Sequence, residues 1–384
     1  MSTLSLPPLS LYVHIPWCVQ KCPYCDFNSH GQKGELPEQA YVQALLSDLE
    51  QECQRLPAEH RRPLHSIFIG GGTPSLFSPA AIAQLLDGVA RLLPMERDIE
   101  ITMEANPGTA EAQRFKDYYS AGVNRLSIGV QSFQAPLLRA LGRIHNPQEA
   151  KQAFAYAEQA GFSRINLDLM HGLPGQSLAQ AMSDLEQAFS LGPSHLSWYQ
   201  LTIEANTAFA SRPPKLPDED LLWDIYQQGQ AKLAEAGYQQ YEVSAYCREQ
   251  DRARHNLNYW RFGDYIGIGC GAHGKLTLPG SIERSERIKH PKGYLEDLRG
   301  YVNRRWQVEA DDLPFEYMLN RLRLFEAIPK AEFGARTGLA LTSIEAALLR
   351  AKAQGLLTET ETHWQVTQQG RLFLNSLLDL FVDE

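Results

Sequence analysis

Short apolar runs separated by helical stretches are the feature that most restricts how this chain can fold. The runs are rich in aliphatic and aromatic residues, which favour strands. Six of them occur in succession, at residues 9–17, 65–69, 98–104, 125–131, 164–170 and 195–203. This alternation predicts six βα units with parallel strands, in an α/β barrel or partial barrel whose functional residues lie at the carboxyl ends of the strands.

The alternation fades after Glu204, and the rest of the chain has a different pattern. A proline-rich connector at 212–217 and a helix at 221–236 precede a block at 255–274 that is rich in aromatic residues and glycine. The tail then predicts helices at 314–327, 343–354 and 367–380, with a short hairpin at 358–366. Helices around one hairpin are typical of a small winged-helix module.

The length of 384 residues is enough for one large domain and a smaller one. We expect a barrel core at 1–205, a connector with the aromatic block packed on the barrel at 206–305, and a mostly helical, winged-helix-like domain at 306–384. The net charge is −9, with both signs mixed along the chain, so nucleic acid is not an expected partner. The acidic tail also argues against DNA binding by the winged-helix-like part.

Three cysteines directly after the first run form the most specific motif. Cys18, Cys22 and Cys25 have the spacing CxxxCxxC. A zinc ribbon would add a second CxxC pair further along, and a ferredoxin would carry a fourth cysteine nearby. A cubane [4Fe-4S] cluster takes one protein ligand per iron, so three thiols would leave one iron open to another molecule.

This loop resembles that of the radical S-adenosylmethionine (SAM) superfamily, in which CxxxCxxC follows the first barrel strand. The resemblance implies a [4Fe-4S] cluster with SAM on the open iron. A glycine run at residues 70–72, followed by Thr73, ends the second predicted strand and lacks the GK[ST] sequence of a phosphate loop. This glycine run has two possible interpretations. It could be a simple turn or, in this barrel, backbone that can approach the methionine end of SAM without steric cost.

Polar residues at or near the ends of later strands are a second signal. Glu104, Gln131 and Asp168 would be costly to bury among apolar neighbours without a ligand or a partner. A common cavity would explain all three, although each could instead bond a neighbouring loop amide. Arg143 could pair with a carboxylate or be a solvated helix residue.

Several motifs together narrow the resemblance to the oxygen-independent coproporphyrinogen III dehydrogenase family. They lie at residues 12–18, 70–75, 129–133 and 168–174, and the similarity covers almost the whole chain. The resemblance implies SAM contacts at Tyr12, Gly71, Gly72, Thr73, Glu104, Gln131, Arg143 and Asp168. It places Gln131 and Asp168 at the ribose hydroxyls and Arg143 at the carboxylate.

Two departures from the dehydrogenase pattern point to another branch of the same family. The dehydrogenase has a cysteine two positions after the third ligand, where this chain has Phe27, and the segment before the first strand is short here. Phe27 and the sequence HNxxYW at residues 255–260 resemble the HemW-type heme chaperones. In that motif His255 could ligate heme iron, and the aromatic rings could cover a porphyrin.

The heme ligand stays open between His255 as a ligand and His255 as a packed core or loop residue. Other candidate ligands are His14, His30, His171, His273 and the pair Cys22-Pro23. Cluster ligation is the stronger interpretation of Cys22. The remaining cysteines, at positions 53, 247 and 270, are expected to be buried and unreactive.

The resemblance implies a heme chaperone that delivers heme to apo-hemoproteins such as respiratory enzymes, with a [4Fe-4S] cluster and SAM helping assembly or release. The alternative is the dehydrogenase itself, which decarboxylates coproporphyrinogen III through radical SAM chemistry, and a third option is another radical SAM activity on a porphyrin-like substrate. No signal peptide or membrane segment is expected, and the six cysteines suit a reducing cytoplasm. Whether heme is held covalently, whether SAM is cleaved, and whether the chain is a monomer or a homodimer stay open.

Overall fold

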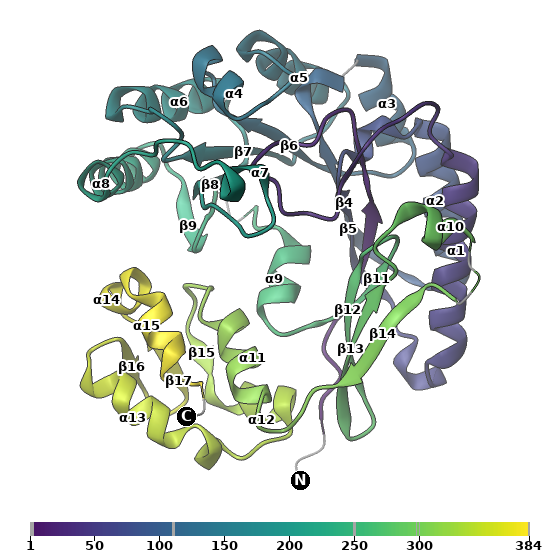
Figure 1. The fold of residues 1–384 in the computed structure, drawn as a ribbon. Helices are drawn as coiled ribbons and strands as arrows, with labels where there is room; N and C mark the ends of the chain where they lie inside the picture. Colours follow the sequence, from purple (N-terminus) through teal and green to yellow (C-terminus); the bar gives the residue numbers. More distant parts are fainter. Residues whose placement is uncertain (1–3, 110–111, 249–250, 297, 299, 383–384) are drawn as a thin grey trace.

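The computed structural model describes residues 4–109, 112–248, 251–296, 298 and 300–382. Its centre is one curved sheet of twelve strands in the order β14-β13-β12-β11-β1-β4-β5-β6-β7-β8-β10-β9 (Figure 1). The six predicted strands are β1 (Leu9–Ile15), β4 (Leu64–Gly71), β5 (Met95–Ala105), β6 (Arg125–Gln131), β7 (Ile165–His171) and β8 (His195–Gln200). Each pairs in parallel with the next, which confirms the predicted partial barrel.

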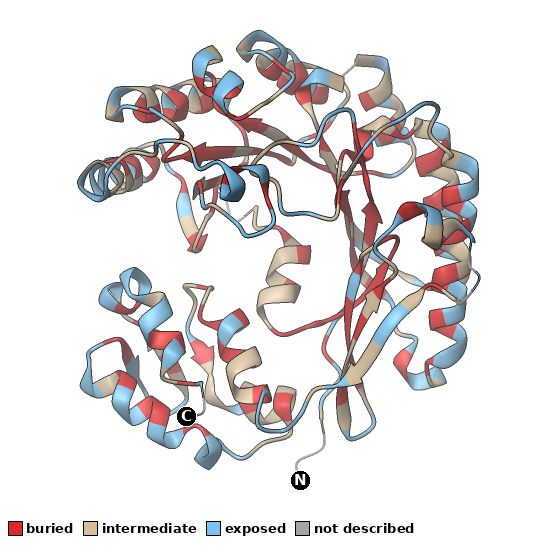
Figure 2. Ribbon diagram, viewed as in Figure 1, coloured by how far each residue is buried: buried red, intermediate tan, exposed pale blue. Residues whose placement is uncertain are grey.

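Helices cover the outer side of this sheet (Figure 1), and all but the last of them lie between successive parallel strands. They are α1 (Glu38–Arg55), α2 (Pro79–Leu92), α3 (Ala112–Ser120), α4 (Ala135–Ala140), α5 (Pro147–Gln159), α6 (Leu178–Leu191) and α8 (Glu219–Glu235). Their inner faces are buried and their outer faces exposed (Figure 2). Local sequence fixes where they start: Asn146 caps α5 through a capping box with Glu149, and Ser177 does the same for α6 with Gln180.

The strands are buried on both faces, as expected for a parallel sheet under helices. In β1 six of seven residues are buried, and the strand lies in a large apolar core that also includes residues of β4 to β8 and the inner faces of the helices. This core fixes the positions of the strand ends. Side chains just beyond those ends are therefore held in place by the packing of the core.

Residues 206–305 supply strands at both edges of the same sheet. At one edge β10 (Ala245–Cys247) and β9 (Gln239–Glu242) follow β8 in antiparallel order. At the other edge β11 (Asp264–Ile268) pairs in parallel with β1, and β12 (His273–Leu278), β13 (Ser281–Arg287) and β14 (Val302–Gln307) continue antiparallel. The predicted connector thus contributes both strands and helices, while the predicted boundaries at 205 and 305 stay predictions.

The C-terminal part has its own apolar core around Tyr317, Phe333 and Trp364. A three-stranded sheet, β15-β17-β16, packs with the helices of this part. The elements are α11 (Leu313–Arg321), β15 (Ile328–Pro329), α12 (Lys330–Thr337), α13 (Glu345–Ala353), β16 (Leu357–Glu359), β17 (His363–Val366), α14 (Gln368–Leu372) and α15 (Leu374–Asp379). The helix predicted at 367–380 is divided in two because Phe373 leaves the helical backbone conformation.

The C-terminal part lies across the gap between the two sheet edges, with α9 (Arg254–Trp260) between it and the strands (Figure 1). Leu324 forms a bridge to Glu242 at the end of β9. On the other side Arg284 of β13 donates to Glu316 of α11 at 2.5 Å. Within the described residues no helix is long and apolar enough to cross a bilayer.

Candidate cofactor-binding site

One cavity of about 360 Å³ is surrounded by the carboxyl ends of the parallel strands. Ten of the twelve predicted site residues line it, namely Cys18, Cys22, Cys25, Gly71, Gly72, Thr73, Glu104, Gln131, Arg143 and Asp168. We call it the strand-end cavity. Its position agrees with the rule that barrels of this class place their functional residues where the strands end.

The cysteine loop leaves β1 and is closed at its base by two short strands. β2 (Trp17–Cys18) pairs with β3 (His30–Gly31) in parallel. Asn28 ties the loop to the segments that follow β11 and β13, since its amide donates to the carbonyl oxygens of Cys270 at 2.9 Å and Lys289 at 2.8 Å. The three thiols are therefore presented to the cavity by a loop anchored at both ends.

The cysteine set fits a cubane cluster better than a single metal ion. Among the described residues no three His, Cys, Asp or Glu side chains are grouped closely enough to hold one ion, whereas a cubane takes one thiolate on each of three separate irons. Burial raises the pKa of the Cys18 and Cys25 thiols, so iron must displace protons when it binds. Arg143 Nη1 lies 3.7 Å from Cys22 Sγ and offers positive charge to the thiolate.

The glycine run forms a cradle beside the thiols. Gly71 has φ +117°, a conformation that other residues rarely adopt, and a Cβ there would lie 2.5 Å from the ring of His14. A Cβ on Gly72 would lie 2.6 Å from the carbonyl oxygen of Trp17. Both positions thus require glycine, and the bare backbone that lines the cavity suits the close approach of a ligand such as the methionine end of SAM.

Two buried carboxyl groups face the same space. Burial and the nearby Asp168 raise the pKa of Glu104 to about 8, although its Oε2 accepts the Gly71 N–H at 3.0 Å. Burial also raises the pKa of Asp168, against hydrogen bonds from Ser127 at 2.7 Å and Asn166 at 2.8 Å. A positively charged ligand would favour the ionised form of both carboxyl groups, and SAM carries both an ammonium and a sulfonium.

Gln131 and Arg143 complete the polar lining. Gln131 has φ +67° and accepts a hydrogen bond from the Tyr199 hydroxyl at 3.1 Å through Oε1. Arg143 donates to the Gly129 carbonyl oxygen at 2.5 Å, while its Nε is buried without a hydrogen-bond partner within the described residues. An orphaned buried donor of this kind is uncommon and fits a site that is completed by an acceptor on a ligand.

Tyr12 and His255 are not among the residues that line the strand-end cavity. The Tyr12 hydroxyl lies 2.9 Å from His14 Nδ1, and its ring stacks on Phe68. His255 is buried against Phe68, with Nδ1 3.2 Å from the Ser66 hydroxyl, and burial lowers its pKa to about 3. The role of each residue stays a prediction.

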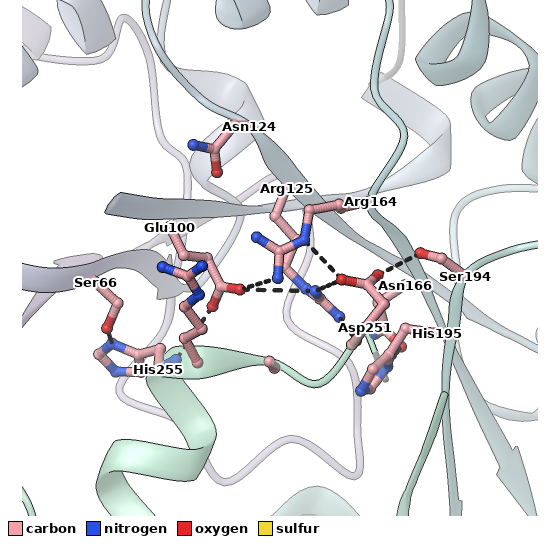
Figure 3. A network of polar contacts seen from close by, with 12 residues as sticks. Ser66, Glu100, Asn124, Arg125, Arg164, Asn166, Ser194, His195, Asp251 and His255 are labelled. Carbon is pink, nitrogen blue, oxygen red and sulfur yellow. Dashed lines mark hydrogen bonds and ion pairs between the residues drawn. The ribbon is translucent and has the colours of Figure 1, made fainter. Parts of the chain in front are cut away.

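An ionic network fixes the position of the start of α9 (Figure 3). Arg164 donates to Glu100 at 2.8 Å and to Asp251 at 2.7 Å, and Arg125 reaches the same Asp251 oxygen at 3.0 Å. Glu100 Oε1 accepts the backbone N–H of His255 at 3.1 Å. The carboxylate of β5 is thereby shared between two arginines and the first turn of α9, which fixes where that helix begins.

The cavity has a further wall that sequence reasoning did not assign to it. Tyr199 of β8 and Asn256 and Trp260 of α9 line it, and Arg323 of the C-terminal part stacks over the Trp260 ring at 4.4 Å. Of these, Asn256 and Trp260 belong to the HNxxYW motif. Arg323 carries no local signal, since it is 63 residues from Trp260 in the chain (323 minus 260).

Comparisons with known proteins agree with this geometry. Two family models match, the radical SAM superfamily over residues 12–188 and the HemN C-terminal domain over residues 308–373. The heme chaperone HemW of Escherichia coli (strain K12) is 60% identical over 382 residues, which cover 99% of this chain and 100% of that protein. The heme chaperone HemW of Bacillus subtilis (strain 168) is 34% identical over 385 residues, with 98% and 99% covered.

Among solved structures, coproporphyrinogen III oxidase (HemN) from Escherichia coli superimposes with a TM-score of 0.82. The alignment covers 98% of this chain and 90% of that chain at 24% sequence identity. At this identity the likeness shows a shared fold and no more.

Proposed function

The chain belongs to the HemW family of heme chaperones within the radical SAM superfamily, and from that premise we propose that it binds heme and delivers it to apo-hemoproteins. The observation that carries this conclusion is the 60% identity to a heme chaperone over the full length of both chains. Coproporphyrinogen III dehydrogenase is not favoured, because the likeness to that enzyme is one of fold at 24% identity.

The radical SAM domain implies a [4Fe-4S] cluster and SAM. Cys18, Cys22 and Cys25 would hold the cluster, since they line one cavity and are tied down at the base of their loop. When bound, the cluster supplies an open iron for SAM and an electron path to it. The thiols must lose their protons for this, and Arg143 beside Cys22 favours the charged form.

The cavity walls supply the residues that would hold SAM. The backbone of Gly71, Gly72 and Thr73 would lie along its methionine end, and the buried Glu104 would attract its positive charge. Gln131 and Asp168 would bind the ribose hydroxyls and Arg143 the carboxylate, as the family resemblance implies. The unpaired Nε of Arg143 supports the last assignment.

The recipient of heme and the cellular setting are further parts of the proposal. Apo-hemoproteins of the respiratory chain are the expected recipients, and the cytoplasm is the expected location. For the assembly we propose a homodimer. His255 is one candidate heme ligand, and its helix α9 already presents Asn256 and Trp260 to the strand-end cavity.

A paired assay on anaerobically reconstituted protein tests the proposed function. One arm titrates hemin by absorbance, and the other measures coproporphyrinogen III turnover with SAM and a strong reductant. Stoichiometric heme binding without turnover, together with transfer of heme to an apo-hemoprotein, is the expected result. Turnover without specific heme binding would replace the chaperone by the dehydrogenase.

A further inference from the structure

A second cavity, of about 920 Å³, lies beside the cluster loop. It is lined by the end of that loop and the segment before α1, residues 29–37, and by the start of α10 (Pro291–Glu296) with His290 before it. None of the residues that we assign to the cluster or to SAM lines it. We call it the His30–His290 groove after the two histidines on its walls.

The groove combines apolar walls with two imidazoles. The apolar residues are Trp17, Leu36, Pro37, Pro291 and Leu295. The rings of His30 and His290 lie with their centres 5.6 Å apart at an angle of 69°. A mostly apolar pocket with a few polar groups at one place is what a flat cofactor-sized ligand requires.

The His30 ring faces the Lys289 carbonyl oxygen, yet one of its nitrogens lacks a well-formed hydrogen bond. Its Nε2 is buried and has no hydrogen-bond partner within the described residues. The neighbouring Lys289 carbonyl oxygen already accepts hydrogen bonds from Asn28 at 2.8 Å and from the Cys270 thiol at 2.7 Å. An unpartnered imidazole nitrogen is costly to bury, and a ligand in the groove would remove that cost.

The number of ligating side chains in the groove distinguishes between a bare metal ion and heme. A bare metal ion needs three or four protein ligands, and no such group exists in the described part of the chain. Heme iron already has four porphyrin nitrogens and takes one or two axial ligands from the protein, often histidine. A histidine pair without a third ligand therefore suits heme.

Two lysines at the groove suit the propionate groups of the same ligand. Lys33 and Lys292 are exposed residues of its lining and would meet propionate groups at the rim. Glu35 and Glu296 also line the groove, and Lys292 lies 3.6 Å from Glu296. That pair is exposed on both sides, so water already screens it and a propionate can compete for the ammonium.

We propose that heme binds in the His30–His290 groove, with its iron ligated by this histidine pair and its propionates held by Lys33 and Lys292. The inference rests on the proposed heme-binding function and names the site for it. Heme there would touch the same short loop as the cluster, because Gln32 donates its backbone N–H to the Cys18 carbonyl at 2.7 Å and the Ser29 hydroxyl lies 3.7 Å from Cys25 Sγ.

Hemin titration of the full reconstituted chain tests the site. The variants are His30→Ala, His290→Ala and both together, with His363→Ala, a partly exposed histidine of β17 outside the groove lining, as the matched control. The double variant is expected to bind hemin at least tenfold more weakly and with a changed Soret band, while the control binds like the wild type. Iron and sulfide contents must match the wild type in every variant.

The outcomes separate the site from the function. A wild-type chain that binds no hemin overturns the proposed function and the site with it. A wild-type chain that binds hemin, with a double variant of unchanged affinity and spectrum, overturns the groove and leaves the function standing. Loss of binding in His255→Ala with the double variant unaffected moves the site to α9.

Two measurements on the wild type need no substitution. Electron paramagnetic resonance of the heme-loaded chain should show histidine ligation, and a cysteine thiolate signal would overturn the assignment. Hemin dimethyl ester, which lacks free carboxylates, should bind at least tenfold more weakly than hemin. Equal affinity for the ester and for hemin would show that Lys33 and Lys292 do not hold the propionates.

Discussion

The backbone N–H of Gly71 donates a hydrogen bond to Glu104 Oε2 at 3.0 Å, so the glycine cradle after β4 and the carboxyl group of β5 form one unit. Neither residue can move independently of the other. A ligand that contacts the glycine cradle would therefore also contact the Glu104 carboxyl group.

Replacing this carboxyl group should weaken SAM binding. Glu104→Gln keeps the size and an acceptor for Gly71 but cannot become negatively charged, so at pH 9, where Glu104 is ionised, SAM should bind at least tenfold more weakly, which is about 1.4 kcal/mol. Calorimetry on cluster-loaded protein measures this. Glu96→Gln, at the start of the same strand and paired with His65 at 2.9 Å, is the control. Equal SAM affinity in both variants would contradict the assigned role.

The same carboxyl group should make stability depend on pH. Its pKa is about 8 in the folded chain against 4.5 ordinarily, so the folded state holds the proton more tightly and stability is lost as pH rises from about 4.5 to 8. Glu104→Gln should therefore raise the free energy of unfolding by roughly 2 kcal/mol at pH 9 and by little at pH 4.5. Urea unfolding without SAM at both pH values checks the difference. An equal gain at both would show that the effect is not ionisation.

The cluster thiols are open to a direct test. Cys18→Ser, Cys22→Ser and Cys25→Ser should each leave anaerobically reconstituted protein with little iron or labile sulfide, because serine does not replace a cluster thiolate. Cys53→Ser, on the buried face of α1, should keep the wild-type content. A wild-type content of iron and sulfide in the variant that carries all three substitutions would contradict the cluster assignment.

The network under α9 should contribute more stability than an exposed ion pair. Glu100 is fully buried between Arg164 and Arg125, so Glu100→Gln should cost about 3 kcal/mol in urea unfolding. It should also speed hydrogen exchange in α9, since the His255 N–H loses a charged acceptor. Glu186→Gln, in an exposed pair with Lys232, should cost less than about 1 kcal/mol. Similar costs for both variants would mean that the network does not hold the helix.

The parallel strands and the cavity were predictable because they follow from local rules. Short apolar runs located β1 and β4 to β8, and parallel order then placed their carboxyl ends together. This brought Glu104, Gln131 and Asp168 to one cavity without knowledge of their contacts. Helix starts at Asn146 and Ser177 follow from capping residues in the sequence.

What escaped prediction depends on partners distant in the chain. The helix predicted at 314–327 ends at Arg321, because the next residues pair with β9, where Val243 donates its N–H to the Arg323 carbonyl oxygen at 3.2 Å. Arg323 reaches the cavity wall for the same reason. The burial of His255 likewise depends on Phe68 and Ser66 of β4, and no local pattern around residue 255 encodes that contact.

The bonds from Asn28 to the carbonyl oxygens of Cys270 and Lys289 set an order of events during synthesis. The cysteine loop is among the first segments to leave the ribosome, yet its anchor points are translated more than 240 residues later, as is β11, one of the two strands that pair with β1. Contacts of such long sequence separation form late. The loop therefore lacks these two anchors until residue 289 has been translated, although the pairing of β2 with β3 at its base can form early.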